Sequence, residues 1–272
     1  MSTIAVDDRR HATLVRNGRT ITMVATRELL RLRRTPTRVI AGLTQPIIFL
    51  FIMGAGLGRL IETETAGFDF QEFLFPGILA MSVMTSSLFS AMTIVVDREF
   101  GFMREMLVAP VSRTSIVLGK AVGGGSVAVV QGLILVVAAP VVGVSLSPAR
   151  IVGLVAALLL LAYAVVAFGV VLASRMARME SFQMVMTLVL QPMIFLSGAV
   201  FPLQSLPGWL AVLTRLNPAT YGVDLVRRVV LSDTPGVTIN GATVPMWAEG
   251  LLVLGLGTGL LALAVRLFRS TE

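Results

Sequence analysis

Cysteine is absent from the 272 residues, and histidine occurs once, at His11. A chain without thiols forms neither disulfide bonds nor thiolate metal sites, and one histidine in a polar N-terminal stretch cannot hold a metal ion alone. Catalytic clusters are also missing, because no histidine–carboxylate group and no acidic pair at ligand spacing fall in the apolar segments. We therefore expect no catalytic residue, no metal and no cofactor in this chain, and no enzymatic activity.

Charged residues are scarce as well, at 14% of the chain, whereas hydrophobic residues reach 56% and the mean hydropathy is +0.88. Soluble domains usually carry about 25% charged residues, so the composition predicts an integral membrane protein. The net charge of +7 would suggest nucleic acid binding in a soluble protein. Here no basic patch is interleaved with stacking aromatic residues, so we expect membrane lipid and no nucleic acid as a partner.

Long segments without charge alternate with polar segments. Residues 73–96 and 121–147 contain no charged side chain, and each exceeds the roughly 20 apolar helical residues that cross a bilayer. Six transmembrane helices are predicted, at residues 39–58, 73–96, 121–144, 151–173, 182–200 and 246–268. The predicted fold class is an all-α membrane protein with a single domain over residues 1–272, in which residues 39–268 form the six-span bundle.

The basic residues predict the orientation of these spans. Seventeen of the 22 lysine and arginine residues fall in the segments 1–38, 97–120 and 174–180 and at the C-terminus, which lie on the same side of the bundle. Cytosolic loops carry an excess of basic residues, so both termini are predicted to be cytosolic. No short apolar core follows Met1, so we expect no cleavable signal peptide. The expected location is the inner (cytoplasmic) membrane, as a multi-pass protein.

Residues 1–19 are predicted to form a cytosolic tail, and residues 20–36 an amphipathic helix on the membrane surface. In the second segment, apolar residues recur at helical spacing and basic residues fall on the other side, as in helices of the headgroup layer. A core helix of a soluble domain would show the same spacing, but this segment leads directly into a span, with Pro36 at the bend. The residues assigned to this interfacial helix are Arg27, Glu28, Arg31 and Arg34.

The uncharged run from 181 to 214 is too long for one ordinary span, and Pro202 and Pro207 interrupt it. Irregular backbone at membrane depth is stable only where protein or water covers it. We therefore predict re-entrant helices between spans 5 and 6, within residues 203–231. A long external loop is the alternative, but this segment is too apolar for one.

Between spans 2 and 3 lies the charged segment 97–120, which reads DREFGFMREMLVAPVSRTSIVLGK. Phe102, Met106 and Leu107 can form one apolar edge of a short helix, with Arg104 and Glu105 beside it. Such a helix can sit in a groove of a cytosolic protein while its charges fix the register. A solvated surface helix remains the alternative on residue type alone.

This segment resembles the cytosolic loop of ABC-2 type transporter permeases, whose pattern runs Arg-Glu-x-Gly-x-x-Glu-x-Leu-x-x-x-Pro. A second resemblance covers the stretches 196–202, 206–210 and 216–221, which are similar to the region after the fifth span in the same permeases, especially the daunorubicin-resistance-type drug exporters. Phe102 departs from the pattern, where a small threonine is more common. The residues compared with the pattern are Arg98, Glu99, Gly101, Glu105, Leu107 and Pro110, of which Glu105 and Leu107 stand one position later than the pattern has them.

The resemblance implies a permease subunit of an ATP-driven ABC exporter, which moves an amphipathic drug, lipid or related molecule out of the cytoplasm and can confer drug resistance. It implies a dimer with a second permease copy or homologue, and a separate ABC ATPase subunit that binds ATP and Mg. The loop would form a coupling helix docked on that ATPase, and the interfacial helix would touch it too. The chain itself has no G-x-x-x-x-G-K-[ST] phosphate loop. The residues assigned to coupling are Arg98, Glu99, Gly101, Phe102, Arg104, Glu105, Met106, Leu107 and Pro110.

The resemblance also implies a substrate path along spans 2 and 5. Polar side chains at membrane depth require an interhelical hydrogen bond or a wet cavity, and methionine and phenylalanine suit a surface that accepts varied apolar shapes. Ordinary helix packing at the dimer seam and an export path both remain open. The candidate path residues are Ser82, Ser86, Phe89 and Thr93 on span 2, and Gln183, Thr187, Gln191 and Phe195 on span 5.

An ATPase-independent channel or secondary carrier is the alternative function. No charged residue falls in the middle of a predicted span, and ion-driven carriers usually keep an ionisable relay there, so the sequence counts against a carrier. Asp224 and Arg228 stand four residues apart in the predicted re-entrant region, and we expect them to form an ion pair on a helix.

Overall fold

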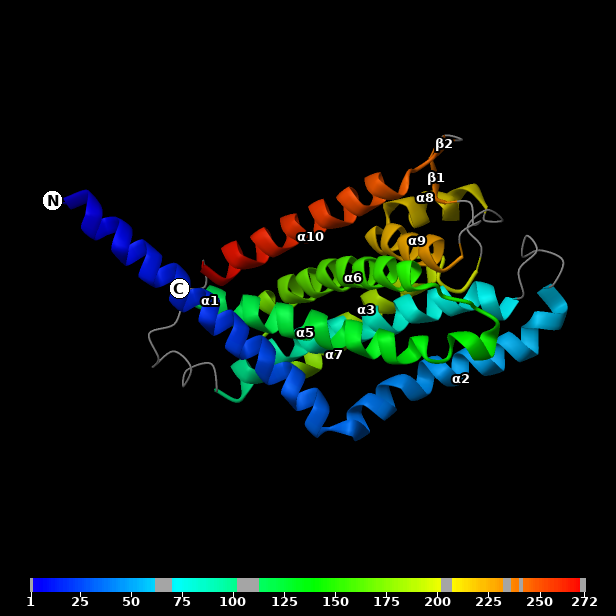
Figure 1. Cartoon of the computed structure of the whole chain (residues 1–272), viewed down its shortest axis with the longest axis horizontal. Coiled ribbons are helices and arrows are strands. Elements are labelled where there is room, and N and C mark those ends of the chain that lie inside the picture. The colour runs from blue at the N-terminus through cyan, green and yellow to red at the C-terminus, as the bar shows by residue number, and fades with distance from the viewer. Residues whose placement is uncertain are drawn as a thin grey trace.

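The computed structural model describes residues 2–61, 70–101, 113–201, 207–231, 236–239 and 242–269. The fold is almost entirely helical, which confirms the predicted all-α class. The described residues also form one short β-hairpin (Figure 1). The elements are α1 (Ser2–Arg34), α2 (Pro36–Ile61), α3 (Phe70–Glu99), α5 (Arg113–Val136), the 3-10 helix η1 (Ala139–Val142), α6 (Pro148–Arg175), α7 (Met179–Phe195), α8 (Gly208–Leu216), α9 (Pro218–Val230), β1 (Thr238–Ile239), β2 (Ala242–Thr243) and α10 (Met246–Arg269).

Four helices are long and apolar enough to cross a membrane, namely α3, α5, α6 and α10. The bent pair of α1 and α2 raises the number to five. The predicted span at 182–200 corresponds to α7, which has 17 residues and ends at Phe195. The helix stops there because the chain turns through Gly198, whose φ of 76° is a left-handed conformation that favours glycine. The described residues thus give four to five candidate spans where the sequence predicted six.

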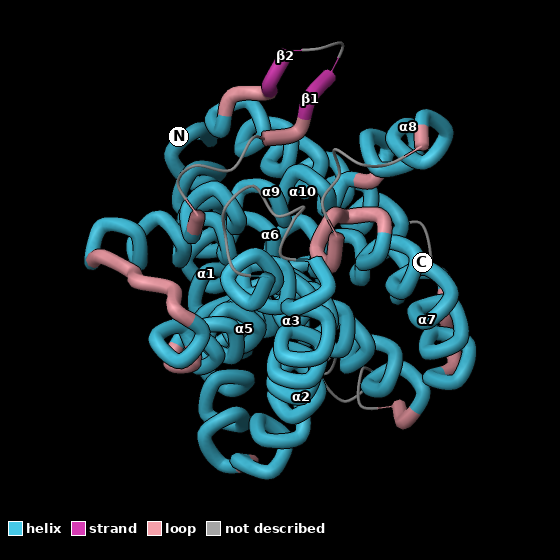
Figure 2. Tube along the Cα trace, turned by 90° about the vertical axis from the view of Figure 1, so that its right-hand side faces the viewer, coloured by secondary structure: helices cyan, strands magenta, loops and turns pink. Residues whose placement is uncertain are grey.

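Helix α3 lies near the centre of the bundle and packs against α2, α5, α6, α7 and α9, while α7 lies at the edge (Figure 2). Helix α7 packs mainly against α3. Its buried side chains recur every four residues, at Phe182, Met186, Leu190 and Ile194, and so form a single stripe. The rest of α7 is largely exposed in one protomer.

Helix α1 continues over the residues predicted as a tail, since it begins at Ser2 and not at Thr20. It meets α2 at a bend of 72°, and Pro36 is the first residue of α2, where its missing amide proton costs nothing. The apolar face of α1 packs against α5. A Cβ on Gly119 would lie 2.8 Å from Val24 Cβ, and one on Gly123 would lie 2.9 Å from Ala25 Cα, so these glycines allow the close approach.

Two short helices, α8 and α9, occupy the segment predicted as re-entrant. Asn217 begins α9 as its N-cap, because its side-chain oxygen accepts a bond of 3.1 Å from the amide of Ala219. The hairpin β1–β2 before α10 was not predicted. We call the end of the bundle that bears this hairpin the hairpin end. The opposite end, where α3, α6 and α10 finish, is called the basic end.

Candidate functional site: the end of helix α3

Three consecutive charged residues, Asp97, Arg98 and Glu99, close helix α3 at the basic end. Successive residues of an α-helix point about 100° apart, so the three side chains face different neighbours. The helix then stops at Gly101, which has a left-handed φ of 77° and donates its amide to the carbonyl of Arg98 at 3.3 Å. This is the conformation in which glycine ends many helices, which explains the glycine of the sequence pattern.

Asp97 faces α5 and forms an ion pair with Lys120. The Lys120 side chain is buried, and its Nζ also donates to the backbone oxygen of Thr93 at 3.0 Å. A buried cation is stable only when it is paired and hydrogen-bonded, so the pair fixes α5 to α3. The sequence placed Lys120 at the end of a charged loop, whereas the structure places it within the first two turns of α5.

Arg98 faces the end of α6. Its guanidinium donates to three carbonyl oxygens there, those of Ala173 and Ser174 at 3.3 Å and that of Met176 at 3.0 Å. It also lies 5.4 Å from the centroid of the Phe268 ring on α10. The last carbonyls of a helix have no partner within the helix and carry partial negative charge, so a cation stabilises them. Arg98 therefore joins α3 to both α6 and α10.

Glu99 faces the start of α7, and its Oε2 accepts a hydrogen bond of 2.8 Å from the backbone amide of Met179. The first amides of a helix need external acceptors, and a carboxylate there also interacts favourably with the helix dipole. Unlike Lys120, Glu99 is exposed. The end of α3 is thus connected to α5, α6, α7 and α10 by three adjacent residues.

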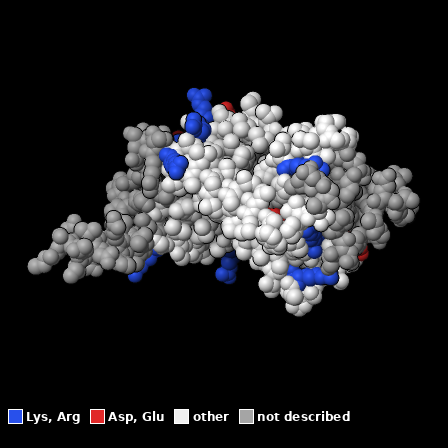
Figure 3. All heavy atoms as spheres, turned by 90° about the horizontal axis from the view of Figure 1, so that it is seen from above, with Lys and Arg blue, Asp and Glu red and all other residues white. Residues whose placement is uncertain are grey.

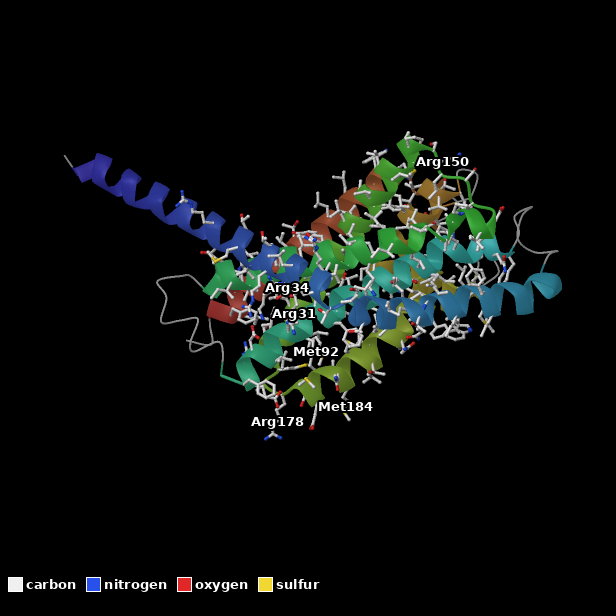
Figure 4. The ribbon with its side chains drawn as sticks, turned by 60° about the horizontal axis from the view of Figure 1, so that its bottom comes forward. Arg31, Arg34, Met92, Arg150, Arg178 and Met184 are labelled. Carbon is white, nitrogen blue, oxygen red and sulfur yellow. The ribbon has the colours of Figure 1, made fainter. Side chains whose placement is uncertain are left out.

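Of the residues assigned to coupling, Arg98, Glu99 and Gly101 are in this junction. The remaining ones, Phe102, Arg104, Glu105, Met106, Leu107 and Pro110, lie outside the described residues. Of the residues assigned to the interfacial helix, Arg27, Arg31 and Arg34 are exposed, and Glu28 packs near Gly123 of α5. Figure 4 shows Arg31 and Arg34 together on the last turns of α1.

Three of the four predicted path residues of α3, namely Ser82, Ser86 and Thr93, are buried or partly buried within the bundle. Ser82 is buried, Ser86 Oγ donates to Gln131 Oε1 of α5 at 2.8 Å, and Thr93 Oγ1 donates to the Ser90 carbonyl at 2.7 Å. Phe89 is 40% exposed. A small polar cavity of about 40 Å³ lies between α1, α3 and α5. It brings Ser86 and Thr93 together with Glu28 and Arg31, which the sequence assigned to a different role.

The predicted path residues of α7 lie on its exposed side. Gln183, Thr187, Gln191 and Phe195 are all exposed, and Thr187 Oγ1 donates to the Gln183 carbonyl at 3.0 Å. Figure 4 shows Arg178 and Met184 pointing away from the bundle at this surface. Because α7 meets α3 through its buried stripe, the two predicted halves of the path do not face each other within one protomer.

At the hairpin end, a second set of charges is buried. Arg227 donates from NH2 to the carbonyls of Gly198 at 2.7 Å and Ala199 at 3.4 Å, and its guanidinium lies 4.2 Å from the Phe73 ring centroid. Burial lowers the pKa of Arg227 to about 10, and the nearby Asp224 carboxylate acts in the opposite direction. Arg227 therefore remains a cation at neutral pH.

The predicted pair of Asp224 and Arg228 is confirmed, with Arg228 Nε 2.8 Å from Asp224 Oδ2. Asp224 also accepts from the amide of Val237 at 3.3 Å, and Arg228 donates to the carbonyl of Val244 at 2.8 Å. Arg228 lies 3.4 Å from Glu249 Oε1 of α10, whose side chain is 0% exposed. These contacts fix α9, the hairpin and α10 together. The sequence predicted neither the partners of Arg227 nor a role for Glu249, because the residues that they contact are distant along the chain.

Charged side chains on the face shown in Figure 3 form two groups toward the ends, separated by a mostly uncharged surface. That distribution is typical of a bundle surrounded by lipid. Within the described part of the chain, no group of three or more His, Cys, Asp or Glu side chains is placed to hold a metal ion.

Comparison with known sequences matches residues 19–231 to the family described as ABC-2 type transporter. The chain is 33% identical over 200 residues to nodulation protein J of Rhizobium meliloti (strain 1021), covering 72% of this chain and 74% of that protein. It is 30% identical over 206 residues to the putative transport permease ycf38 of Cyanophora paradoxa, covering 74% and 70%. The Pyropia yezoensis protein of the same name is 31% identical over 213 residues, covering 76% and 72%.

Proposed function

Because this chain belongs to the ABC-2 type transporter family, we propose that it is the permease subunit of an ATP-driven exporter. The chain is a multi-pass membrane transporter subunit, and we propose that a separate ABC ATPase binds ATP and Mg for it. The chain itself would carry out no hydrolysis. The basic end would face the cytosol, since most of the lysine and arginine residues gather in its segments.

The junction at the end of α3 is the observation that carries this proposal. Three charged residues connect α3 to four other helices, and the segment 102–112, with the family pattern, follows directly. A partner that docks on this segment would therefore act on the bundle at its most connected point. The segment would serve as the coupling helix, with Glu105 and its apolar neighbours in contact with the ATPase.

The exposed face of α7 supports an amphipathic substrate. Gln183 and Gln191 would be costly in contact with lipid alone, because their amides need hydrogen bonds. Beside them, Met184, Leu188 and Phe195 are 75%, 73% and 48% exposed. We propose that this mixed face meets a second permease copy or homologue and borders the path of a drug, a lipid or a related molecule. The residues of α3 that line the small cavity would then serve packing between α1, α3 and α5.

The proposal is tested by co-purification with the ABC ATPase encoded nearest to this gene, followed by measurement of ATP hydrolysis in the complex. We expect a stable complex, and we expect Glu105→Arg to insert normally but to lose coupled hydrolysis. Glu64→Arg, in the loop predicted for the opposite side, is the control and should change neither. Transport by the purified chain in vesicles without any ATPase would instead establish the channel or carrier function.

A further inference from the structure

We propose that Glu99 is a positioning residue that transmits movement of the 102–112 segment to α7. This inference rests on the proposed function. It concerns the hydrogen bond that joins the end of α3, directly before the coupling segment, to helix α7. The hydrogen bond from the Met179 amide to Glu99 joins the last turn of α3 to the first residue of α7. Its loss would leave the described residues of the two helices joined at this end by side-chain packing, with Arg98 still bound to Met176 in the connection before α7.

The start of α7 lacks an acceptor of its own. Its N-cap position is occupied by Arg178, and an arginine side chain carries only donors. Helices usually have Ser, Thr, Asp or Asn at this position, because those side chains accept from the first amides. Helix α7 therefore takes its cap from α3. A cap that comes from another helix ties the start of α7 to the end of α3 while the bond is closed, and frees the start of α7 when the bond opens.

The three links of the junction differ in strength. Lys120 is buried and binds both Asp97 and the Thr93 carbonyl, and Arg98 has three carbonyl partners as well as the Phe268 ring. Glu99 is exposed and makes one short bond to the part of the chain that the structure describes. We therefore expect the contacts to α5, α6 and α10 to stay intact. The hydrogen bond to α7 can break and re-form at a small cost in free energy.

The opposite end of α7 is held more firmly. Asn217 Nδ2 donates to the Met193 carbonyl at 2.7 Å, and Thr220 Oγ1 donates to the Leu196 carbonyl at 3.1 Å. Between the two ends, one buried stripe contacts α3. Among the described residues, the start of α7 is held by the exposed Glu99 bond, by Phe182 of this stripe and, through the connection from α6, by the Arg98 bond to Met176. Opening the Glu99 bond loosens this end of α7 and leaves the other end fixed, so the helix can pivot. Glu99 is where a force from the segment after α3 would reach it.

The absence of cysteine makes a direct distance measurement simple, because two introduced cysteines carry the only labels. Phe100 and Met184 are 68% and 75% exposed, so Phe100→Cys and Met184→Cys accept spin labels without disturbing the core. The distance between the labels is measured in the full complex with the ATPase, without nucleotide and with ATP plus vanadate. We expect a nucleotide-dependent shift in this distance and its loss in Glu99→Ala. Glu99→Gln should keep the shift, because its amide oxygen still accepts the bond.

A second variant separates transmission from simple capping. Arg178→Ser gives α7 a local cap, so Glu99→Ala combined with Arg178→Ser restores the start of the helix but not its connection to α3. We expect the double variant to be folded, to bind the ATPase and to lack the distance shift. A normal shift in the double variant or in Glu99→Ala would overturn the inference. Neither result would affect the proposed function, which fails if no ATPase complex forms or if the purified chain transports without an ATPase.

Discussion

The two ends of the bundle use the same kinds of side chain in different ways. At the hairpin end, Arg227 and Glu249 are buried, the Arg228 side chain is 12% exposed, and the arginines each have several partners. At the basic end, Arg98 is equally well connected, but Glu99 is exposed and makes a single bond to the described residues. The difference teaches that charge can either fix helices permanently or join them reversibly, depending on burial and on the number of partners.

Free energies express the same contrast. Removing one partner of a buried charge pair costs about 3–5 kcal/mol, because the other charge remains buried without a partner. Removing a helix cap costs about 0.5–2 kcal/mol. We therefore expect substitutions at the hairpin end to act on stability, and substitutions at Glu99 to act on coupling.

The largest effect is expected for Arg228→Leu, which leaves Asp224 and Glu249 without their cation. We expect a loss of about 3–5 kcal/mol in unfolding free energy, measured by thermal or denaturant unfolding in detergent. Arg150→Leu is the matched control, since Arg150 makes one long contact of 3.5 Å to the Ser145 carbonyl. Equal stability of the two variants would show that the contacts of Arg228 do not hold the hairpin end together.

A smaller effect is expected for Gly77→Ala, because a Cβ at Gly77 would overlap the carbonyl of Ala199, where the chain turns after α7. Overpacking of this kind costs about 1–3 kcal/mol. The control is Gly255→Ala in α10, where the described residues leave open space around the new Cβ. There the better helix propensity of alanine should raise stability by up to about 1 kcal/mol. Unfolding measurements should therefore give opposite signs, and a common sign would contradict the close approach.

Glu99→Ala comes next in its effect on stability. We expect a loss of about 1 kcal/mol from the missing cap, together with a complete loss of the coupling between ATP hydrolysis and α7. The melting temperature checks the loss of stability, and ATP hydrolysis in the complex checks the loss of coupling. If Glu99→Ala destabilised the protein as strongly as Arg228→Leu, the proposed contrast between the two ends would be wrong.

The smallest effect on stability is expected for Gln191→Leu, since Gln191 is exposed in one protomer. Surface substitutions of this kind usually stay within about 0.5 kcal/mol. If the exposed face of α7 meets a second permease, the substitution should alter the dimer fraction in detergent, as measured by light scattering. Met23→Leu on the exposed side of α1 is the control. Identical dimer fractions for both variants would remove α7 from the proposed interface.

The spans that carry no charge in their middle could be read from the sequence. The ends of α3, α6 and α10 agree with the predicted spans to within about three residues, because a long apolar run without a central charge has few alternatives to a membrane helix. Helix α5 begins earlier than predicted. Lys120 suggests a solvated loop, but Asp97 of another helix neutralises it. The hydropathy of one segment gives no information about a neutralising partner on another helix.

The site was predicted in part. The family pattern identified Arg98 and Glu99, but it suggested contact with an ATPase, whereas the structure shows both bound within the bundle. The ion pair of Asp224 and Arg228 was predictable because both lie on one helix. The contacts of Arg227 and the role of Glu249 were missed, because the turn after α7 and the packing of α10 on α9 are tertiary features.

The central claim is that the basic end moves at α7 while the hairpin end holds its shape. Two pairs of spin labels in the ATPase complex test it directly, one at Phe100→Cys and Met184→Cys and one at Trp209→Cys and Trp247→Cys, all of which are exposed positions. We predict that ATP plus vanadate shifts the first distance and leaves the second unchanged. A shift confined to the second pair, or an equal shift in both, would contradict the account.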